Sequence, residues 1–256
     1  MADPGAPGLR LRVARLAWGE ESLFDDLTIE FPAGRWTCLL GASGCGKTTM
    51  LRLAAGLLPG GVATASDGLP LSGRIAYMAQ SDMLLPWLDV RENLIVGWRL
   101  RRSDRTTLRE KRAMADRLLG RVGLAGLGDA APATLSGGMR QRAALARTIM
   151  EDRPVVLMDE PFSALDAITR HRLQDLAAEL LVGRTVVLVT HSPQEALRLG
   201  HEVRILGGLP VVPGAPIRLH GSPPRDAGDP SVLALQARLL RELAGSSAPL
   251  ELEACA

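Results

Sequence analysis

Eight consecutive residues of this chain have the types and the spacing of a phosphate-binding loop. Residues 41–48 read Gly-Ala-Ser-Gly-Cys-Gly-Lys-Thr and fit the pattern G-x-x-x-x-G-K-[ST]. The glycines allow a tight turn whose N–H groups converge, and no Cβ blocks the approach of a phosphate. Lys47 adds a positive charge for the β and γ phosphates, and Thr48 offers a hydroxyl to Mg²⁺. The expected nucleotide contacts are Gly41, Ala42, Ser43, Gly44, Cys45, Gly46, Lys47, Thr48 and Thr49.

The segments on both sides of this loop match the context that the motif requires. Residues 36–40 form a short apolar run, typical of a buried strand, and residues 49–55 read as the helix that would follow. The start of that helix would add its positive end to the phosphate site. A chance glycine-rich turn is the alternative, and it gives no reason for a strand and a helix at the two ends.

A second apolar run ends in two carboxylates. Residues 155–158 read Val-Val-Leu-Met and predict a central parallel strand, and Asp159 and Glu160 follow at once. Transfer of a phosphoryl group to water needs a tether for Mg²⁺ and a group that orients the water. Asp159 is the candidate for the first task and Glu160 for the second. Taken alone, the pair could equally be a polar turn, and the phosphate loop favours the catalytic interpretation.

A second candidate phosphate site lies at residues 136–138, which read Ser-Gly-Gly. These residues open a helix that we expect over 137–150. Free N–H groups and the Ser136 hydroxyl would therefore meet at the positive end of a helix. When the segment is taken alone, an ordinary capped helix is the alternative for Ser136, Gly137 and Gly138.

Composition limits the classes of protein to consider. The chain has 256 residues, 46% of them hydrophobic, which is enough for the core of one large domain. Its net charge of +2 gives no basis for binding nucleic acid. Three scattered cysteines predict neither a disulfide framework nor a metal site. No stretch reads as a transmembrane helix or a signal peptide, so we expect a cytoplasmic protein that can still dock on a membrane partner.

Strands and helices alternate along the chain in the manner of an α/β protein. We expect strands at 9–16, 23–31, 35–40, 74–78, 155–158, 185–189, 203–206 and 210–212. We expect helices at 49–55, within 89–122, and at 137–150, 167–181, 193–199 and 232–243. The stretches 59–70 and 213–230 are rich in Gly, Pro and Ser and predict irregular structure. Asp89 and Glu92 predict a capping box at the first helix of the stretch 89–122.

With these motifs in this order, the chain resembles the ATP-binding-cassette family, and in particular its transporter ATPase subunits, over about residues 9–212. The resemblance implies an α/β fold, with a P-loop NTPase core of the RecA-like type, an antiparallel β subdomain and a helical subdomain that carries the family's signature segment. It implies a single domain over 1–256, with a core lobe at about 9–83 and 151–212, the helical subdomain at about 84–150, and a short C-terminal extension at 213–256. ATP and Mg²⁺ are the implied cofactors, and hydrolysis of the ATP γ-phosphate is the implied reaction.

The resemblance also assigns roles outside the phosphate loop. In the family the signature segment acts in trans, so Ser136, Gly137 and Gly138 of one subunit would complete the ATP site of the other in a head-to-tail homodimer. Gln80 would contact Mg²⁺ and the attacking water, and His191 would sense the γ-phosphate. The implied catalytic residues are Glu160, His191 and Gln80, and the implied metal ligands are Thr48, Gln80 and Asp159.

Three positions depart from the residues that are usual in the family. Trp18 stands where most members have a Tyr that stacks on adenine, and a Trp packed at a strand end is the alternative. Met139 replaces the usual Gln of the signature, and Ser192 stands where Asp often follows the switch histidine. Neither of the last two removes a phosphate contact, so we still expect an active ATPase.

An apolar cluster follows Gln80 and is the candidate for contact with a membrane partner. Leu84, Leu85 and Trp87 would be exposed on a hinge loop and line a docking groove. In the family such a groove accepts a short coupling helix from an integral membrane permease subunit. Burial of these side chains beneath the helical subdomain is the alternative.

The residues of two segments point to one subgroup of the family. Leu-Leu-Pro-Trp at 84–87 and Met-Arg-Gln-Arg at 139–142 look similar to importers of nitrate, sulfonates, taurine and thiamine-precursor pyrimidines. That subgroup implies a peripheral ATPase on the cytoplasmic face of the inner membrane, a separate permease and, indirectly, a periplasmic binding protein. A soluble ATPase without a transport role and the ATPase of an exporter are the alternatives. The cargo cannot be read from the sequence, because its contacts would lie on other subunits.

Overall fold

The larger of two β-sheets carries the parallel strands. The computed structural model describes residues 5–19, 21–101 and 106–246 of the chain. The strand order of this sheet is β10-β8-β3-β7-β6-β5, and β9 pairs with β8. The five parallel strands are β3 (Trp36–Leu40), β5 (Ile75–Met78), β6 (Val155–Asp159), β7 (Thr185–Val189) and β8 (Glu202–Gly207). The short strands β9 (Val212–Pro213) and β10 (Ile217–Arg218) run antiparallel to β8.

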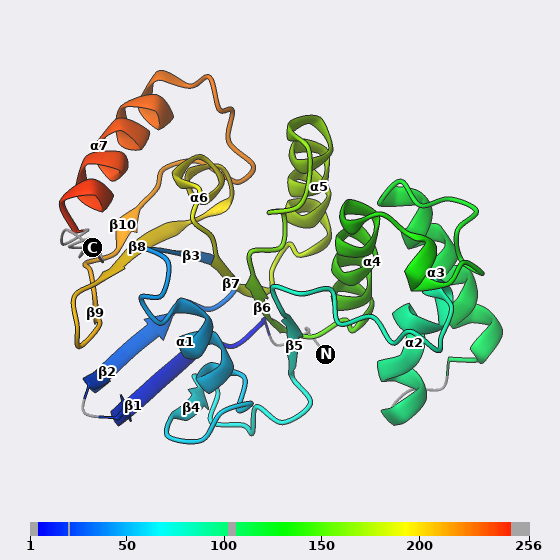
Figure 1. Cartoon of the computed structure of the whole chain (residues 1–256), viewed down its shortest axis with the longest axis horizontal. Helices are drawn as coiled ribbons and strands as arrows, with labels where there is room; N and C mark the ends of the chain where they lie inside the picture. Colours follow the sequence, from blue (N-terminus) through cyan, green and yellow to red (C-terminus); the bar gives the residue numbers. More distant parts are fainter. Residues whose placement is uncertain (1–4, 20, 102–105, 247–256) are drawn as a thin grey trace, which may run out of the picture.

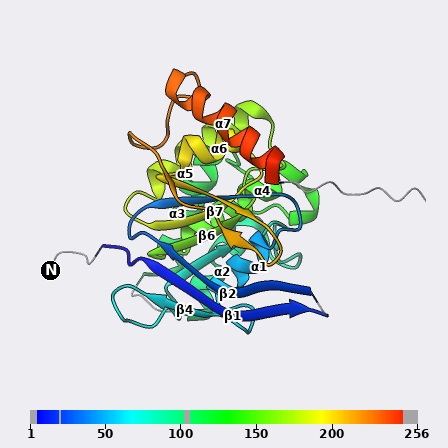
Figure 2. The same ribbon diagram turned by 90° about the vertical axis from the view of Figure 1, so that its left-hand side faces the viewer.

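These central strands are apolar throughout because both faces of the sheet are covered. Alternate residues of a strand point to opposite faces. In β6, Val156 and Met158 belong to the hydrophobic core on one face, whereas Val155 and Leu157 belong to the core on the other. Figure 2 shows α5, α6 and α7 on one side of the sheet and the smaller sheet on the other. The carboxyl ends of the parallel strands are therefore held by packing on two sides.

The smaller sheet is antiparallel and has the order β2-β1-β4. It consists of β1 (Leu9–Trp18), β2 (Glu21–Phe31) and β4 (Val62–Ala65). The expectation of irregular structure throughout 59–70 is wrong, since β4 pairs with β1 from Leu9↔Ala65 to Arg12↔Val62. The inward side chains of β1 and β2 share a core with α1 (Lys47–Ala54), which follows the phosphate loop.

Three helices form a lobe at one end of the molecule, as Figure 1 shows. They are α2 (Val90–Arg101), α3 (Leu108–Arg121) and α4 (Gly137–Met150), with a short 3-10 helix at Pro132–Thr134. Asp89 caps α2, because its Oδ1 accepts the N–H of Glu92 at 2.7 Å. The capping box is nevertheless only half correct, because the Glu92 carboxylate pairs with Arg99 and Arg112 instead of returning to Asp89.

Three further helices lie on the face of the larger sheet that is opposite the smaller sheet (Figure 2). They are α5 (Ala167–Leu180), α6 (Pro193–Leu199) and α7 (Pro230–Ser246). Residues 213–230 were expected to be irregular, and most of them are, but β10 lies within them. Among the described residues, no helix has both the length and the apolar character needed to cross a membrane. The architecture confirms the expected α/β fold, with a parallel core, an antiparallel β subdomain and a helical lobe.

Candidate active site

The phosphate loop connects β3 to α1, as the motif requires. Gly44 and Gly46 have φ angles of 80° and 84°, which L-residues with a side chain rarely adopt. A Cβ at Gly41 would lie 2.6 Å from both Sγ of Cys45 and the carbonyl oxygen of Leu206. The loop is therefore tight enough to exclude side chains at Gly41, and its N–H groups stay accessible to a phosphate.

Lys47 places its ammonium group inside the loop. Its Nζ donates to the carbonyl oxygens of Gly41 at 2.8 Å and Ala42 at 2.7 Å, and lies 3.7 Å from Sγ of Cys45. The residue is only 7% exposed. A charge held by two carbonyls and shielded from water attracts an anion more strongly than an exposed lysine would. The loop therefore provides a positive centre at the start of α1.

Asp159 fits a ligand of a divalent cation. It is buried at the end of β6, and its Oδ2 has no hydrogen-bond partner among the described residues. Burial raises the pKa of this carboxyl, and a hydrogen bond with Thr48 acts in the opposite direction. An unpaired buried carboxylate oxygen beside a hydroxyl suits Mg²⁺, which binds through one or two protein oxygens together with substrate phosphates. In the described part of the chain no three His, Cys, Asp or Glu side chains converge on a metal site, and this kind of Mg²⁺ site does not need them.

Glu160, Gln80 and His191 converge although they follow three different strands. Gln80 comes after β5, Glu160 after β6 and His191 after β7, and these strands are neighbours in the parallel sheet. Oε2 of Glu160 lies 3.5 Å from Nε2 of Gln80 and 3.3 Å from Nδ1 of His191. Parallel strands bring their carboxyl ends to one edge, where ligands of such sheets bind. The predicted catalytic side chains of Gln80 and His191 therefore both approach the same carboxylate oxygen of the third, Glu160.

Glu160 and Gln80 share one hollow with the phosphate loop. A cavity of about 410 Å³ is lined by these two residues and by residues of the loop, among them Ser43, Lys47 and Thr48. A triphosphate held by the loop would therefore extend toward Glu160. This arrangement suits attack of a water molecule on a terminal phosphate.

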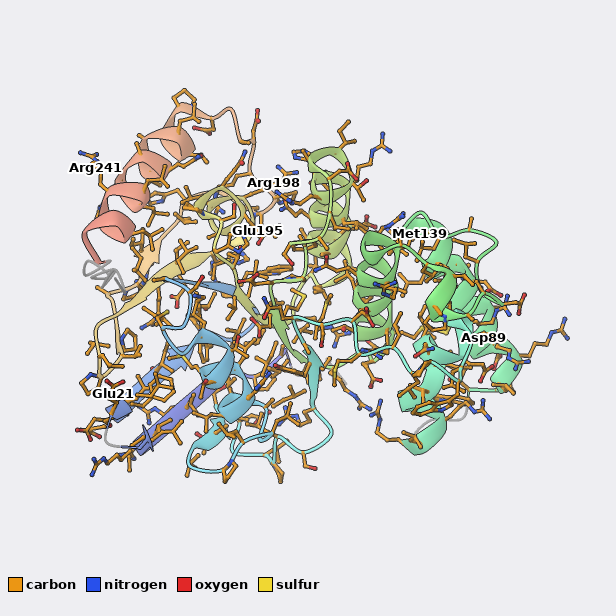
Figure 3. The ribbon with its side chains drawn as sticks, viewed as in Figure 1. Glu21, Asp89, Met139, Glu195, Arg198 and Arg241 are labelled. Carbon is orange, nitrogen blue, oxygen red and sulfur yellow. The ribbon has the colours of Figure 1, made fainter. Side chains whose placement is uncertain are left out.

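The position of His191 is set by α6, which begins directly after it. Glu195 of α6 is buried and accepts a hydrogen bond from Nε2 of Gln174 in α5 at 3.0 Å. Arg198 of α6 forms an ion pair with Asp175, also in α5. Figure 3 labels Glu195 and Arg198 on this helix. These contacts anchor α6, and with it the backbone at His191, to the helix beside it.

The signature segment lies at an exposed helix end. Ser136 caps α4, because its Oγ accepts the N–H of Met139 at 3.3 Å, and Met139 marks this end of the helix in Figure 3. Ser136 and Gly137 are exposed. A Cβ at Gly138 would lie 3.3 Å from the carbonyl oxygen of Ala164. The predicted helix 137–150 is confirmed, and Ser136 and Gly137 at its start are exposed.

Gln141 belongs to this region, and the sequence reasoning gave it no role. Its Nε2 donates to the carbonyl oxygen of Glu160 at 2.9 Å, and its Oε1 accepts the N–H of Ala164 at 2.8 Å. A signal was available, because Gln141 lies on the same face of α4 as the apolar residues Ala144 and Leu145. A glutamine on a buried helix face needs polar partners.

The three residues predicted for docking differ in how far their side chains are exposed. Trp87 is 76% exposed, as expected, and the neighbouring Met83 is 63% exposed. Leu84 is only 8% exposed and belongs to the hydrophobic core that the helical lobe shares with the larger sheet, so its prediction as an exposed residue is wrong. Leu85 is half-buried, with its N–H bonded to Oδ1 of Asn93 at 2.7 Å. The alternation along the loop turns Leu84 inward while Met83 and Trp87 stay outside.

The predicted adenine contact remains a prediction. The backbone of Trp18 ends β1, and its side chain lies outside the described residues. At this end β1 pairs with β2, and Trp18 lies opposite Glu21. The backbone at Trp18 is therefore positioned by the pairing of the two strands.

Known proteins resemble this chain along most of its length. The family model described as ABC transporter matches residues 24–163. An uncharacterized ABC transporter ATP-binding protein of Haemophilus influenzae is 42% identical over 242 residues, which cover 93% of this chain and 99% of the relative. The aliphatic sulfonates import ATP-binding protein SsuB 2 of Burkholderia cenocepacia is 40% identical over 240 residues, which cover 91% of this chain and 86% of the relative.

A solved structure agrees with these relatives. The ATP-binding cassette MJ0796, in a dimeric post-hydrolysis state bound to ADP and Pi, has a TM-score of 0.73 and 27% sequence identity to this chain. The match covers 83% of this chain and 99% of that one. Together with the family model and the nearly full-length relatives, it shows that this chain belongs to the ABC transporter family and is an ATP-binding subunit that hydrolyses ATP.

Proposed function

We propose that this ATPase supplies the energy for a membrane permease that imports aliphatic sulfonates. The observation that carries the catalytic part is the convergence of Glu160, Gln80 and His191 beside the phosphate loop. The cargo is inferred from relatives in Burkholderia, Pseudomonas and Paracoccus that are named as aliphatic sulfonate importers at 38–40% identity. Nitrate, taurine and thiamine-precursor pyrimidines, the other cargoes that the sequence left open, are not named by these relatives.

In this proposal the residues of the chain divide the hydrolysis between them. Lys47 and the loop N–H groups bind the β and γ phosphates and orient the terminal phosphate toward Glu160. Glu160 polarises the attacking water as a general base, while His191 and Gln80 keep its carboxylate oriented. Thr48, Gln80 and Asp159 would hold a Mg²⁺ ion. When bound, such an ion neutralises charge on the phosphate oxygens.

We further propose that two copies of the chain enclose ATP between them. Ser136, Gly137 and Gly138 of one copy would contact the γ-phosphate bound to Lys47 of the other. Two features support this: the exposure of Ser136 and Gly137 at the start of α4 and the dimeric form of the similar cassette. The positive end of a helix suits a phosphate brought by a partner.

The permease would dock at Met83 and Trp87, with Leu85 at the margin of the contact. These residues follow Gln80, so the docking surface is continuous in sequence with a residue of the catalytic cluster. Two large exposed apolar side chains on one loop suit an apolar helix of a partner. The protein would then act at the cytoplasmic face of the membrane as a peripheral subunit, with a periplasmic binding protein on the other side.

Growth of the native host tests the cargo. A strain that lacks this gene should fail to grow with an alkanesulfonate as the sole sulfur source and should grow normally on sulfate. The wild-type gene should restore growth, and the variant Glu160→Gln should not. If the deleted strain grows normally on alkanesulfonates but needs a thiamine precursor, or fails on nitrate, the cargo assignment is wrong and the importer assignment stands.

A further inference from the structure

The backbone at Glu160 adopts a conformation that a glutamate avoids. Its φ angle is 48°, in the left-handed region that favours glycine. Such strain persists only where neighbouring contacts hold the backbone, and it is concentrated at functional sites. On one side, the Glu160 N–H donates to the carbonyl oxygen of Val189 in β7 at 2.9 Å. The carbonyl group of Glu160 must be fixed by other contacts.

Within the turn, the N–H and the hydroxyl of Ser163 donate to the Glu160 carbonyl oxygen at 3.3 and 3.1 Å, and a shorter hydrogen bond to the same oxygen comes from the signature helix. Nε2 of Gln141 in α4 donates to the carbonyl oxygen of Glu160 at 2.9 Å and lies 3.3 Å from Oγ of Ser163. Oε1 of the same amide accepts the N–H of Ala164 at 2.8 Å. One side chain thus binds both ends of the turn 160–164 that follows the catalytic carboxylate.

The geometry around Gln141 leaves this amide little freedom. The residue is 6% exposed, so an amide that lost these partners would have no water to replace them. The backbone of α4 also comes close to the same turn, because a Cβ at Gly138 would lie 3.3 Å from the carbonyl oxygen of Ala164. The helix that begins with the signature segment is therefore both packed against the turn after Glu160 and hydrogen-bonded to it.

We propose that Gln141 is a positioning residue for ATP hydrolysis: its amide holds the turn 160–164 and so keeps the Glu160 carboxylate aimed at the attacking water. This inference rests on the proposed role of Glu160 as general base. It also gives a physical link within one chain between its own Glu160 and the signature end of α4, which in a head-to-tail dimer would serve the other ATP. A change at one ATP site would reach the other through this amide.

Two variants of nearly the same size as glutamine test the role. Gln141→Met removes all three hydrogen bonds of the amide, and Gln141→Glu can still accept the Ala164 N–H but cannot donate to the Glu160 carbonyl. A misplacement of about 1 Å at a reacting group costs roughly 10²-fold in rate. We therefore expect kcat to fall by about 10- to 100-fold in both variants, with the Kd for ATP changed by less than about threefold.

The control is Thr148→Val, which removes a buried hydrogen bond in the same helix without touching the turn. Oγ1 of Thr148 donates to the carbonyl oxygen of Ala144 at 2.9 Å, and among the described residues no hydrogen bond joins this side chain to 160–164. This variant should keep the kcat of the wild type, although its melting temperature should fall by a similar amount to that of the Gln141 variants. In the background of Glu160→Gln, adding Gln141→Met should leave the residual turnover unchanged, because the carboxylate through which Gln141 acts is already gone.

The outcomes separate this inference from the proposed function. Normal kcat in Gln141→Met and Gln141→Glu, with Glu160→Gln inactive, would overturn the inference alone. A loss of ATP binding as large as the loss of kcat would also overturn it, because the role would then be structural. Full turnover in Glu160→Gln would refute the proposed base and with it the positioning role.

Discussion

Nδ1 of His191 lies 3.3 Å from Oε2 of Glu160, and the two residues follow neighbouring strands of the parallel sheet. Nε2 of Gln80 approaches the same oxygen from the strand on the other side, at 3.5 Å. A carboxylate held from both sides has few orientations open to it. The two contacts thus orient the carboxylate of Glu160, the proposed general base.

Replacement of Glu160 by Gln should separate ATP binding from hydrolysis. The amide keeps the size of the carboxylate but cannot accept a proton, and a positioned base contributes about 10²–10⁴-fold. We expect turnover to fall by that factor while ATP binding is retained, and an ATP-bound dimer to accumulate in gel filtration because products no longer form. The control is Glu179→Gln, an exposed carboxylate on α5. Turnover of Glu160→Gln within about threefold of the wild type would rule out the role of the base.

Replacement of Lys47 by Ala should weaken nucleotide binding. The variant loses the ammonium group that lies inside the loop, and a hydrogen bond to a charged group contributes about 1.5–3 kcal/mol. The Kd for ATP should therefore rise by roughly 10- to 100-fold, and hydrolysis should stop. Lys47→Arg keeps the charge but is too large for the enclosed position, so it should also lose activity. Equilibrium binding of a fluorescent ATP analogue measures the Kd of both variants. An unchanged Kd in Lys47→Ala would refute the phosphate-loop assignment.

Some features were predictable from the sequence because a local pattern determines them. The phosphate loop needs glycines at fixed spacing, and a parallel strand buried on both faces needs a continuous apolar run. The helix 137–150 was predicted with its observed bounds, since Ser136 caps it and the apolar period follows at once. In each case the information lies within about ten neighbouring residues.

Other features depend on partners that are distant in sequence. The strand β4 has four residues, pairs with β1 alone and is bounded by glycines and a serine, so its local signal is that of a loop. Leu84 and Trp87 are both apolar and three positions apart, and only the packing of the helical lobe decides that Leu84 turns inward. The hydrogen bond from Gln141 to the carbonyl oxygen of Glu160 likewise joins two segments that no short sequence motif connects.

Ser136 should matter for the ATP site of the partner subunit. In Ser136→Arg, a bulky charged side chain would enter that site, so a homodimer of this variant should be inactive. Mixed with Lys47→Ala chains, it forms heterodimers in which one of the two sites escapes both changes. We expect the mixture to recover part of the ATPase activity, up to about half per heterodimer if the sites act independently. Neither variant should be active alone, and a mixture in which no ATP-dependent dimer forms would contradict the proposed arrangement.

Trp87 and Leu84 together test the permease-docking surface, because one is exposed and the other is buried. An apolar side chain buried at an interface contributes about 1.5–3 kcal/mol. Trp87→Asp should therefore leave the melting temperature and the basal ATPase rate of the free subunit unchanged and reduce co-purification with the permease by roughly 10- to 100-fold. Met83→Asp should act in the same way, since its side chain lies on the same exposed loop.

Leu84→Asp should behave in the opposite manner. Its side chain packs in the hydrophobic core that the helical lobe shares with the larger sheet, and removal of a buried leucine side chain costs about 2–5 kcal/mol before the cost of a buried charge is added. The free subunit should therefore melt at a lower temperature whether or not a permease is present. Exposed Leu57, on the segment after α1, is a matched control, because Leu57→Asp should change neither property if docking is confined to Met83 and Trp87. Normal co-purification of a stable Trp87→Asp subunit would remove this loop as the docking surface.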